Sequence, residues 1–458
     1  MISEKNFVLG IAPTRRKMYN PSFTHANRKA VLEQTAELVA GLPVTLVGIE
    51  WLNDEGILVD LEDVQKVEEH FRRAKVDAVF MPHCNFGSEE VVGKLGKAMG
   101  KPFLLWGGRD DAPPPDRAMR QTDTQCGLFA SSKALQRYGV PFTYIENCRP
   151  EEEAFRQGFL DFLRSAAAAK AFHTTRVGQI SLRPKPFLSV IVNESELLER
   201  FGIEVVPVQG VEIVAKITDF LASRKEDVRQ RVEDIRGKMD CATMDGEAME
   251  KIAATELAIA DTAAEYGCNV MASECWVTYG KSFGIRPCFL FGDLIDRGLI
   301  TACETDICGA VTMRMLKAAT LGSGLPFLAD LTVRHPTNDN AELLWHCGPF
   351  PQSLARQPEK RELIRFTGHW ELKHGPITVA RFDGICGDYK LFAGEGRGVE
   401  GPATNGNYVW LEVDNWVKWE KKFIYGPYIH HVACMHGNWT GVLEEACKYL
   451  GGVALDRP

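Results

Sequence analysis

Residues 301–330 decide how we interpret the chain, and their sequence is TACETDICGAVTMRMLKAATLGSGLPFLAD. A short apolar run precedes Glu304, and Asp306 then has the place of an N-cap for a helix with one broad apolar face. Gly322 marks the end of that helix, and a second apolar run closes at Asp330. The stretch therefore predicts a strand, a helix and a second strand.

The two carboxylates of this stretch, Glu304 and Asp330, each come at the end of a predicted strand. Because two strands joined by a helix in one sheet are normally parallel, both should end at the same edge. Open parallel sheets bind ligands at that edge, and two carboxylates crowded there repel each other unless a cation lies between them. We therefore predict a divalent metal site. The alternative is a pair of solvated loop acids.

The composition limits the class of protein. The chain has 458 residues, which suits two or three domains. A net charge of -8 argues against nucleic acid or an anionic membrane as the main partner. No apolar run approaches the roughly 20 residues that span a bilayer, and the N-terminus lacks a secretory pattern. The 13 cysteines are scattered without a Cys-x-x-Cys pair, so we expect reduced thiols in a cytoplasmic protein.

The order of predicted elements indicates an α/β protein. Apolar strands alternate with helical patterns over most of the chain, which predicts doubly wound parallel sheets. After residue 348, short strands rich in glycine and β-branched residues predict a small β-barrel or sandwich. We expect two doubly wound, Rossmann-like domains, residues 1–170 and 171–348, followed by a small antiparallel β-barrel domain with a closing helix, residues 349–458. The central domain carries the two carboxylates.

Histidines lie where they could complete a metal site. His346 follows an apolar run, and His430 and His431 follow another. Successive side chains of an extended strand face opposite ways, so only one of His430 and His431 can point into a site. Alternatively, each histidine is a hydrogen-bonded core residue. Two carboxylates with one or two imidazoles suit Mn²⁺, Fe²⁺ or Co²⁺. Thiolates have no role in this set, which argues against a structural zinc.

Several segments resemble the L-fucose isomerase and L-arabinose isomerase superfamily, and the resemblance covers most of the chain. The N-terminus looks like that of fucose isomerases, and two later segments look like those that hold the family's metal carboxylates, which fall on Glu304 and Asp330. His431, followed by Gly437, matches the family's C-terminal histidine ligand. His346 falls where arabinose isomerases keep an additional histidine ligand, a role that fucose isomerases lack. The segments are residues 10–18, 32–35, 301–306, 327–330 and 375–382.

The resemblance implies a cytoplasmic, Mn²⁺-dependent aldose–ketose isomerase that works through a cis-enediol, with Co²⁺, Fe²⁺ or Mg²⁺ as other possible ions. Glu304 and Asp330 would be both metal ligands and the acid/base pair, and the ion would stabilise the enediolate oxygens. Family analogy also implies a homo-oligomer, a trimer or hexamer, with the active site near a subunit interface. The implied substrate-binding residues are Arg15, Arg16, Asn85, Glu274 and Trp276, although Glu274 could equally be a structural acid.

The sugar is left open by the sequence. The first-domain loops differ from those of the family, so we expect a pentose, a deoxyhexose or a substituted hexose, including one with an anionic group. Two other readings remain. One is a non-catalytic sugar-binding or regulatory protein, and the other is a metal-dependent epimerase or aldolase, since both of these reactions also need an enediolate beside a metal.

Overall fold

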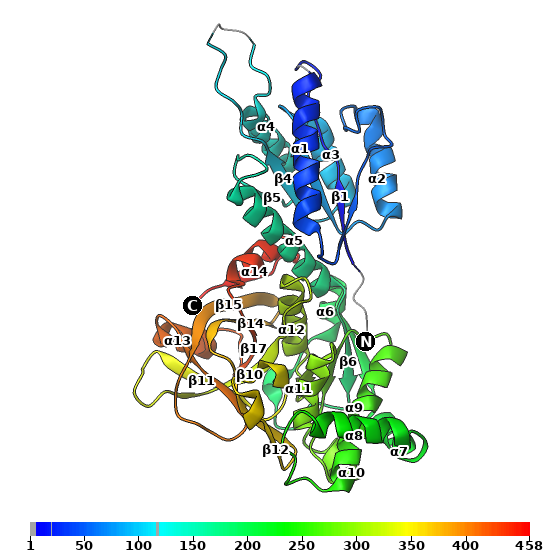
Figure 1. Ribbon diagram of the computed structural model, residues 1–458, viewed down its shortest axis with the longest axis vertical. Helices are drawn as coiled ribbons and strands as arrows, with labels where there is room; N and C mark the ends of the chain where they lie inside the picture. Colours follow the sequence, from blue (N-terminus) through cyan, green and yellow to red (C-terminus); the bar gives the residue numbers. More distant parts are fainter. Residues whose placement is uncertain (1–5, 20, 116–118) are drawn as a thin grey trace. The chain divides into compact units, whose positions relative to one another are not determined.

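The computed structural model describes residues 6–19, 21–115 and 119–458. They form two compact units, which divide between residues 170 and 171 (Figure 1). The first unit ends at Lys170, and the second runs from Ala171 to Pro458.

The N-terminal unit is built on a parallel sheet with strand order β2-β1-β3-β4-β5. All residues of β3 and β4 are buried, as expected for parallel strands with helices on both faces. The strand order reverses between β1 and β3, and such a switch point is where doubly wound sheets bind ligands. The strands are β1 Phe7–Ile11, β2 Val44–Val47, β3 Ala78–His83, β4 Phe103–Gly107 and β5 Thr143–Tyr144, and the helices are α1 Pro21–Val39, α2 Val64–Arg73, α3 Glu89–Met99, α4 Thr124–Tyr138 and α5 Glu153–His173, which ends in the second unit.

The second unit begins with a four-stranded parallel sheet of order β7-β6-β8-β9. Its helix α12 is buried at every residue except Lys317, which places it in the interior rather than on a surface. The strands are β6 Arg176–Ile180, β7 Glu204–Val208, β8 Val270–Ser273 and β9 Ile300–Cys303, and the helices are α6 Glu194–Phe201, α7 Gly210–Ser223, α8 Lys225–Arg236, α9 Gly246–Glu265, α10 Thr278–Phe283, α11 Cys288–Asp296 and α12 Ile307–Ala319.

The remaining strands form a nine-stranded mixed sheet of order β12-β13-β16-β11-β10-β17-β14-β15-β18. Strand β15 also pairs with β16, so the pairings of β16, β11, β10, β17, β14 and β15 run in a ring. The bounds are β10 Phe327–Arg334, β11 Ala341–His346, β12 Glu362–Ile364, β13 Thr367–Glu371, β14 Gly375–Ile385, β15 Asp388–Val399, β16 Asn407–Glu412, β17 His431–His436 and β18 Ala454–Asp456, with helices α13 Trp416–Tyr425 and α14 Thr440–Cys447.

One prediction about residues 301–330 is wrong. Strands β9 and β10 do not share a parallel sheet, because β10 pairs antiparallel with β11 and β17 in the mixed sheet. Nor does Asp330 end its strand, since β10 continues to Arg334. The apolar run Phe327–Ala329 finds its partners in residues 432–434, about a hundred positions further along the chain. The strands β10 and β11, which we assigned to the central domain, therefore pair with strands of the C-terminal one.

No helix in the described part of the chain is long and apolar enough to cross a membrane.

Candidate functional site

Glu304 is held at the carboxyl end of β9 by an unusual backbone turn. Glu304 and Thr305 both have left-handed backbone conformations, with φ of +57° and +55°, and such conformations cost a non-glycine residue of the order of 1–2 kcal/mol. The turn is fixed by backbone hydrogen bonds from Thr305 N to Ser273 O and from Asp306 N to Cys303 O. Backbone strain that the surrounding structure imposes on a residue is typical of functional sites.

Three adjacent strands of the mixed sheet supply the other candidate ligands. Asp330 on β10 lies opposite His431 of β17 on one side, and His346 ends the neighbouring strand β11 on the other. The Nε2 atom of His431 is 3.1 Å from Oε2 of Glu304 and 3.3 Å from Oδ1 of Asp330. His346 Nε2 is 3.9 Å from the same oxygen of Asp330. The structure thus brings Glu304, Asp330, His346 and His431 together from two sheets.

The side chains of the two adjacent histidines face different ways, as the alternation along a strand requires. The His431 side chain is 1% exposed and faces the carboxylates, whereas that of His430 is 45% exposed, with its Nε2 4.0 Å from Asp330. Burial lowers the pKa of His430. Only His431 therefore points fully into the cluster.

A chain of buried charges orients His431. Its Nδ1 lies 3.0 Å from Oδ2 of Asp306, which also binds Arg381, and Arg381 donates in turn to Asp383 at 2.9 Å. Burial alone would raise the pKa of Asp306, but Arg381 and His431 hold it well below its usual range. Asp306 is therefore a carboxylate, and it fixes the Nδ1 proton of His431. When the ring is neutral, that tautomer leaves the Nε2 lone pair directed at Glu304 and Asp330.

The groups around His431 carry more negative than positive charge and so favour a cation there. Burial opposes a charged imidazole, yet contacts with Asp306, Glu304 and Asp330 raise the pKa of His431 to about 10. Burial likewise opposes ionisation of Glu304, but its pKa is lowered by His431. Three carboxylates around one imidazole thus stabilise a positive charge at or near Nε2, which a proton or a metal ion can supply.

A divalent ion fits this donor set. Among the described residues, Asp330 Oδ1, His346 Nε2 and His431 Nε2 are buried atoms without a hydrogen-bond partner. Buried polar atoms normally have such partners. Ligand atoms of Glu304, His346 and His431 lie within 4.8 Å of one another, and so do those of Asp330, His430 and His431. Carboxylate and imidazole donors with an outer carboxylate on the far nitrogen of a histidine are typical of metal centres.

His346 differs from His431 in its hydrogen bonding. The backbone N–H of Gly348 donates to His346 Nδ1 at 3.2 Å, so the proton of the neutral ring lies on Nε2. This tautomer makes Nε2 a donor rather than a metal ligand. Its hydrogen bonding therefore gives no support to His346 as a ligand, and that assignment stays a prediction.

Trp276 and Glu274 shape the rim beside Glu304. The indole Nε1 of Trp276 donates to Oε1 of Glu304 at 2.7 Å, and the ring is 51% exposed. Glu274 is buried, and its two oxygens accept backbone hydrogen bonds from Trp276, Val277 and Thr278 at 2.6 to 2.8 Å. Through these bonds Glu274 holds the loop before α10, which gives it a structural role. Binding of a sugar by either residue stays a prediction.

The N-terminal candidates lie in the other unit, and each has local partners. Arg15 forms an ion pair with Glu55 at 2.8 Å. The guanidinium of Arg16 lies 3.7 Å from the ring centroid of Phe86. Asn85 is fully buried and bonds to the backbone of Arg16 and Gly87. The structure groups Arg15, Arg16 and Asn85 around the β1–β3 switch point, and their contact with substrate stays a prediction.

Sequence reasoning missed the groups behind His431. We assigned Asp306 only as an N-cap, which it is, since its Oδ1 accepts from Gly309 N at 2.9 Å. Arg381 lies in the segment 375–382, which we predicted only as a β segment, and Asp383 was given no role. A signal was present, because an arginine inside an otherwise apolar strand requires a buried acid as its partner.

Comparisons with known proteins relate the chain to sugar isomerases. Residues 10–173 match the family model described as the N-terminal domain of fucose/sulfoquinovose isomerases. Proteins named sulfoquinovose isomerase match well beyond that domain. Those of Priestia aryabhattai and Priestia megaterium are each 24% identical over 422 residues, 88% of this chain and 92% of the relative. That of Alkalicoccus urumqiensis is 24% identical over 335 residues, 71% of this chain and 73% of the relative.

The chain is related to the fucose isomerase-like sugar isomerases. These matches confirm the relationship inferred from the sequence and the enzyme class, an isomerase, which is an intramolecular oxidoreductase. Among solved structures, the match to a periplasmic solute-binding protein from Actinobacillus succinogenes 130z with bound D-allose covers 69% of this chain and 92% of that protein. Its sequence identity of 12% and TM-score of 0.17 carry no argument about fold or function.

Proposed function

We propose that this protein is a metal-dependent aldose–ketose isomerase that moves a proton between adjacent sugar carbons through a cis-enediol. The observation that carries the proposal is the convergence of Glu304 and Asp330 on a buried His431 whose Nδ1 is held by Asp306. Glu304, Asp330 and His431 would hold the ion, with Mn²⁺ as the first candidate. When bound, the ion supplies a Lewis acid for two neighbouring sugar oxygens and makes the hydrogen beside the carbonyl more acidic.

The two carboxylates divide the proton transfer. Both side chains are partly open, with 14% of Glu304 and 19% of Asp330 exposed, so each can reach a sugar. The pKa of Glu304 is lowered, and its ionised form can therefore accept a proton from a carbon. The indole N–H of Trp276 fixes the direction of this carboxylate. In the proposed reaction one carboxylate removes the proton from carbon and returns it to the neighbouring carbon. The other carboxylate transfers the hydroxyl proton.

His346 has a different role in this proposal. Its Nε2–H points toward Asp330 without a hydrogen-bond partner among the described residues. A sugar oxygen placed beside Asp330 would satisfy that donor. His346 would thus bind and orient substrate through its Nε2–H.

We propose a substituted hexose with an anionic group as the substrate. Support comes from the name of the relatives, sulfoquinovose isomerase, since sulfoquinovose is an anionic sugar. Arg15 and Arg16, contributed across a subunit boundary of the proposed oligomer, are the candidates to bind the anion. Assembly as a trimer or hexamer and a cytoplasmic location are part of the same proposal, by family analogy.

The substitution Glu304→Gln tests the function. NMR spectra of a panel of pentoses, deoxyhexoses and substituted hexoses, sulfoquinovose included, would be recorded in D₂O with Mn²⁺. Wild-type protein should yield a product of equal carbon count with the carbonyl moved and with deuterium from solvent. Glu304→Gln should abolish both while the protein stays folded. Unchanged turnover in the variant would refute the role of Glu304. Cleavage fragments would indicate an aldolase, and stereochemical inversion without carbonyl movement an epimerase.

If no sugar of the panel is converted, a measurement of metal binding shows whether the metal site or the choice of sugars is wrong. An ion that binds only the folded state at a hundred times its Kd adds about 2.7 kcal/mol of stability. Mn²⁺ should therefore raise the melting temperature of the wild type and have a much smaller effect on Glu304→Gln. Equal shifts in both proteins would place the ion elsewhere.

A further inference from the structure

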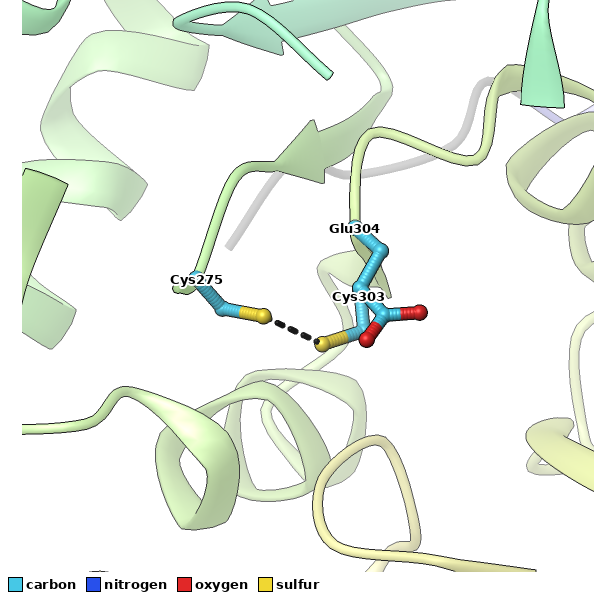
Figure 2. Close-up of side chains that lie close together, drawn as sticks. All are labelled: Cys275, Cys303 and Glu304. Carbon is cyan, nitrogen blue, oxygen red and sulfur yellow. Dashed lines mark hydrogen bonds between the residues drawn. The ribbon is translucent and has the colours of Figure 1, made fainter. Parts of the chain in front are cut away.

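Two buried thiols lie beside Glu304. The Sγ atoms of Cys275 and Cys303 are 3.2 Å apart, with Cys303 as the donor. One ligand atom from each of Cys275, Cys303 and Glu304 lies within 4.8 Å of the other two. Figure 2 shows both sulfurs and the carboxylate gathered at the ends of neighbouring strands. The proposed catalytic site uses only one of these three groups.

The local backbone explains why successive residues face one point. In an extended strand, the side chains of Cys303 and Glu304 would point to opposite sides. The left-handed conformation of Glu304 breaks that alternation and returns its carboxylate toward the thiols. Cys275 arrives from the loop after the adjacent strand β8, where Ser273 is the partner of Cys303.

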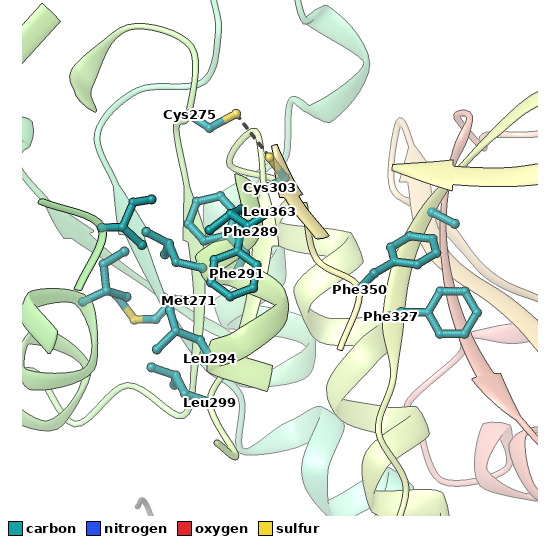
Figure 3. Close-up of a cluster of buried hydrophobic side chains, with 14 of the residues drawn as sticks. Met271, Cys275, Phe289, Phe291, Leu294, Leu299, Cys303, Phe327, Phe350 and Leu363 are labelled. Atoms are coloured by element: carbon teal, nitrogen blue, oxygen red, sulfur yellow. Dashed lines mark hydrogen bonds between the residues drawn. The ribbon is translucent and has the colours of Figure 1, made fainter. Parts of the chain in front are cut away.

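The thiols lie at the edge of the hydrophobic core rather than inside a polar pocket. They belong to a buried cluster with Phe289, Phe291 and Leu363 (Figure 3). The neighbouring thiol of Cys275, together with burial, raises the pKa of Cys303 well above its usual range, and the pKa of Cys275 is also raised. Both are therefore thiols in the absence of a soft ion. Packing alone would explain two buried thiols, but here a carboxylate oxygen also lies within 4.8 Å of both sulfurs.

We propose that Cys275, Cys303 and Glu304 form a second metal site, for a thiophilic divalent ion such as Zn²⁺ or Cd²⁺. Two thiolates about 2.3 Å from a tetrahedral ion are about 3.8 Å apart. The sulfurs therefore need to separate by only about half an ångström from their present 3.2 Å. On binding, each thiol loses its proton to water and forms a bond to the ion, and the carboxylate of Glu304 is the third ligand. The fourth position stays open to water.

The entry path is the open side of Glu304. Cys303 is fully buried and Cys275 is 6% exposed, whereas the indole of Trp276 beside Glu304 is 51% exposed. A soft ion thus enters through the opening that serves the substrate. Its binding occupies Glu304, so it inhibits isomerisation. This consequence rests on the proposed function, whereas the binding site does not.

Cadmium binding to the full-length reduced protein tests the site. Cd²⁺ would be titrated while the ultraviolet charge-transfer band of Cd–thiolate bonds is recorded, with a phosphine as the reductant. We expect one Cd²⁺ per chain with this band, and a weaker band in Cys275→Ser and Cys303→Ser, because each of these variants keeps only one of the two thiolates. Their affinity should fall by more than about tenfold, since loss of an outer-shell partner alone costs about 10–100-fold. The matched control is Cys268→Ser, a buried cysteine just before β8, at the opposite end of that strand.

The outcomes separate the site from its consequence. A wild type without the thiolate band, or a band in Cys275→Ser and Cys303→Ser as strong as that of the wild type, would overturn the site. If Cys303→Ser does not fold, Cys275→Ser and Cys275→Ala decide. With an active substrate in hand, Cd²⁺ should inhibit the wild type and Cys268→Ser at lower concentration than Cys275→Ser. Equal inhibition with a thiolate band in the wild type alone would leave the binding site intact and refute the shared use of Glu304.

Discussion

Asp306→Asn removes one charge while leaving the shape of the site almost unchanged. In the wild type, Oδ1 caps α12 through Gly309 N, and Oδ2 binds both Arg381 and His431 Nδ1. Asparagine caps helices as well as aspartate does. An amide has only one oxygen, however, so it cannot cap the helix and accept from His431 at the same time. If the amide oxygen keeps the cap, the NH₂ group faces the N–H donors of Arg381 and His431.

The expected magnitudes follow from these contacts. Removal of an outer-shell partner of a ligand histidine lowers metal affinity by about 10–100-fold. Breaking one partner from a buried ion pair costs about 3–5 kcal/mol. We expect the lower end, about 3 kcal/mol of unfolding free energy, because Asp383 remains paired with Arg381. The Mn²⁺ dissociation constant should therefore rise by one to two orders of magnitude in a protein that still folds.

Isothermal titration with Mn²⁺ measures the affinity, and urea unfolding measures the stability. The control is Asp383→Asn, which removes the other carboxylate from Arg381 but does not contact His431. It should reduce stability and leave Mn²⁺ affinity near that of the wild type. The reasoning is refuted if Asp306→Asn binds Mn²⁺ as tightly as the wild type, or if the two variants lose affinity equally.

Two further predictions concern stability. Burial raises the pKa of Glu342 to about 7, so the folded state binds a proton that the unfolded state releases. Stability should then fall as the pH rises from about 4.5 to about 7, by roughly 1–3 kcal/mol after solvent screening. Urea unfolding of Glu342→Gln across this range should show a flatter profile, and an identical profile would contradict the assignment. Gly127→Ala places a Cβ in steric clash with the carbonyl oxygen of Phe86, so it should lower the melting temperature of the protein. Gly441→Ala in α14 meets nothing within 4 Å, so it should add up to about 1 kcal/mol; a drop in melting temperature as large as that of Gly127→Ala would show that the clash is not the cause.

The sequence was informative where a signal is local. The apolar run before Glu304, the cap at Asp306 and the alternation at His430 and His431 all depend on neighbours a few positions away, and the structure has each of them. Sheet membership is different. Periodicity identifies Phe327–Ala329 as a strand. Its partner strand depends on which of several distant segments packs best against it, and in the structure it pairs with residues 432–434.

The second role of Asp306 was hidden for a related reason. One carboxylate can cap a helix with one oxygen and orient a histidine with the other, and the first role already explains the residue. Only the position of Arg381, 75 residues away, indicates the second. The pair of thiols was missed because Cys275 and Cys303 are separated by 28 residues, a spacing that resembles no metal-binding motif.

The pairing of β10 with β17 has a consequence for protein synthesis. Chains emerge from the ribosome N-terminal end first, at about 5–20 residues per second, and strand pairs distant in sequence form late. Glu304 and Asp330 are translated about a hundred residues before His431. In the proposed metalloenzyme, selection of the cation would therefore wait until β17 docks against β10 and supplies the oriented imidazole.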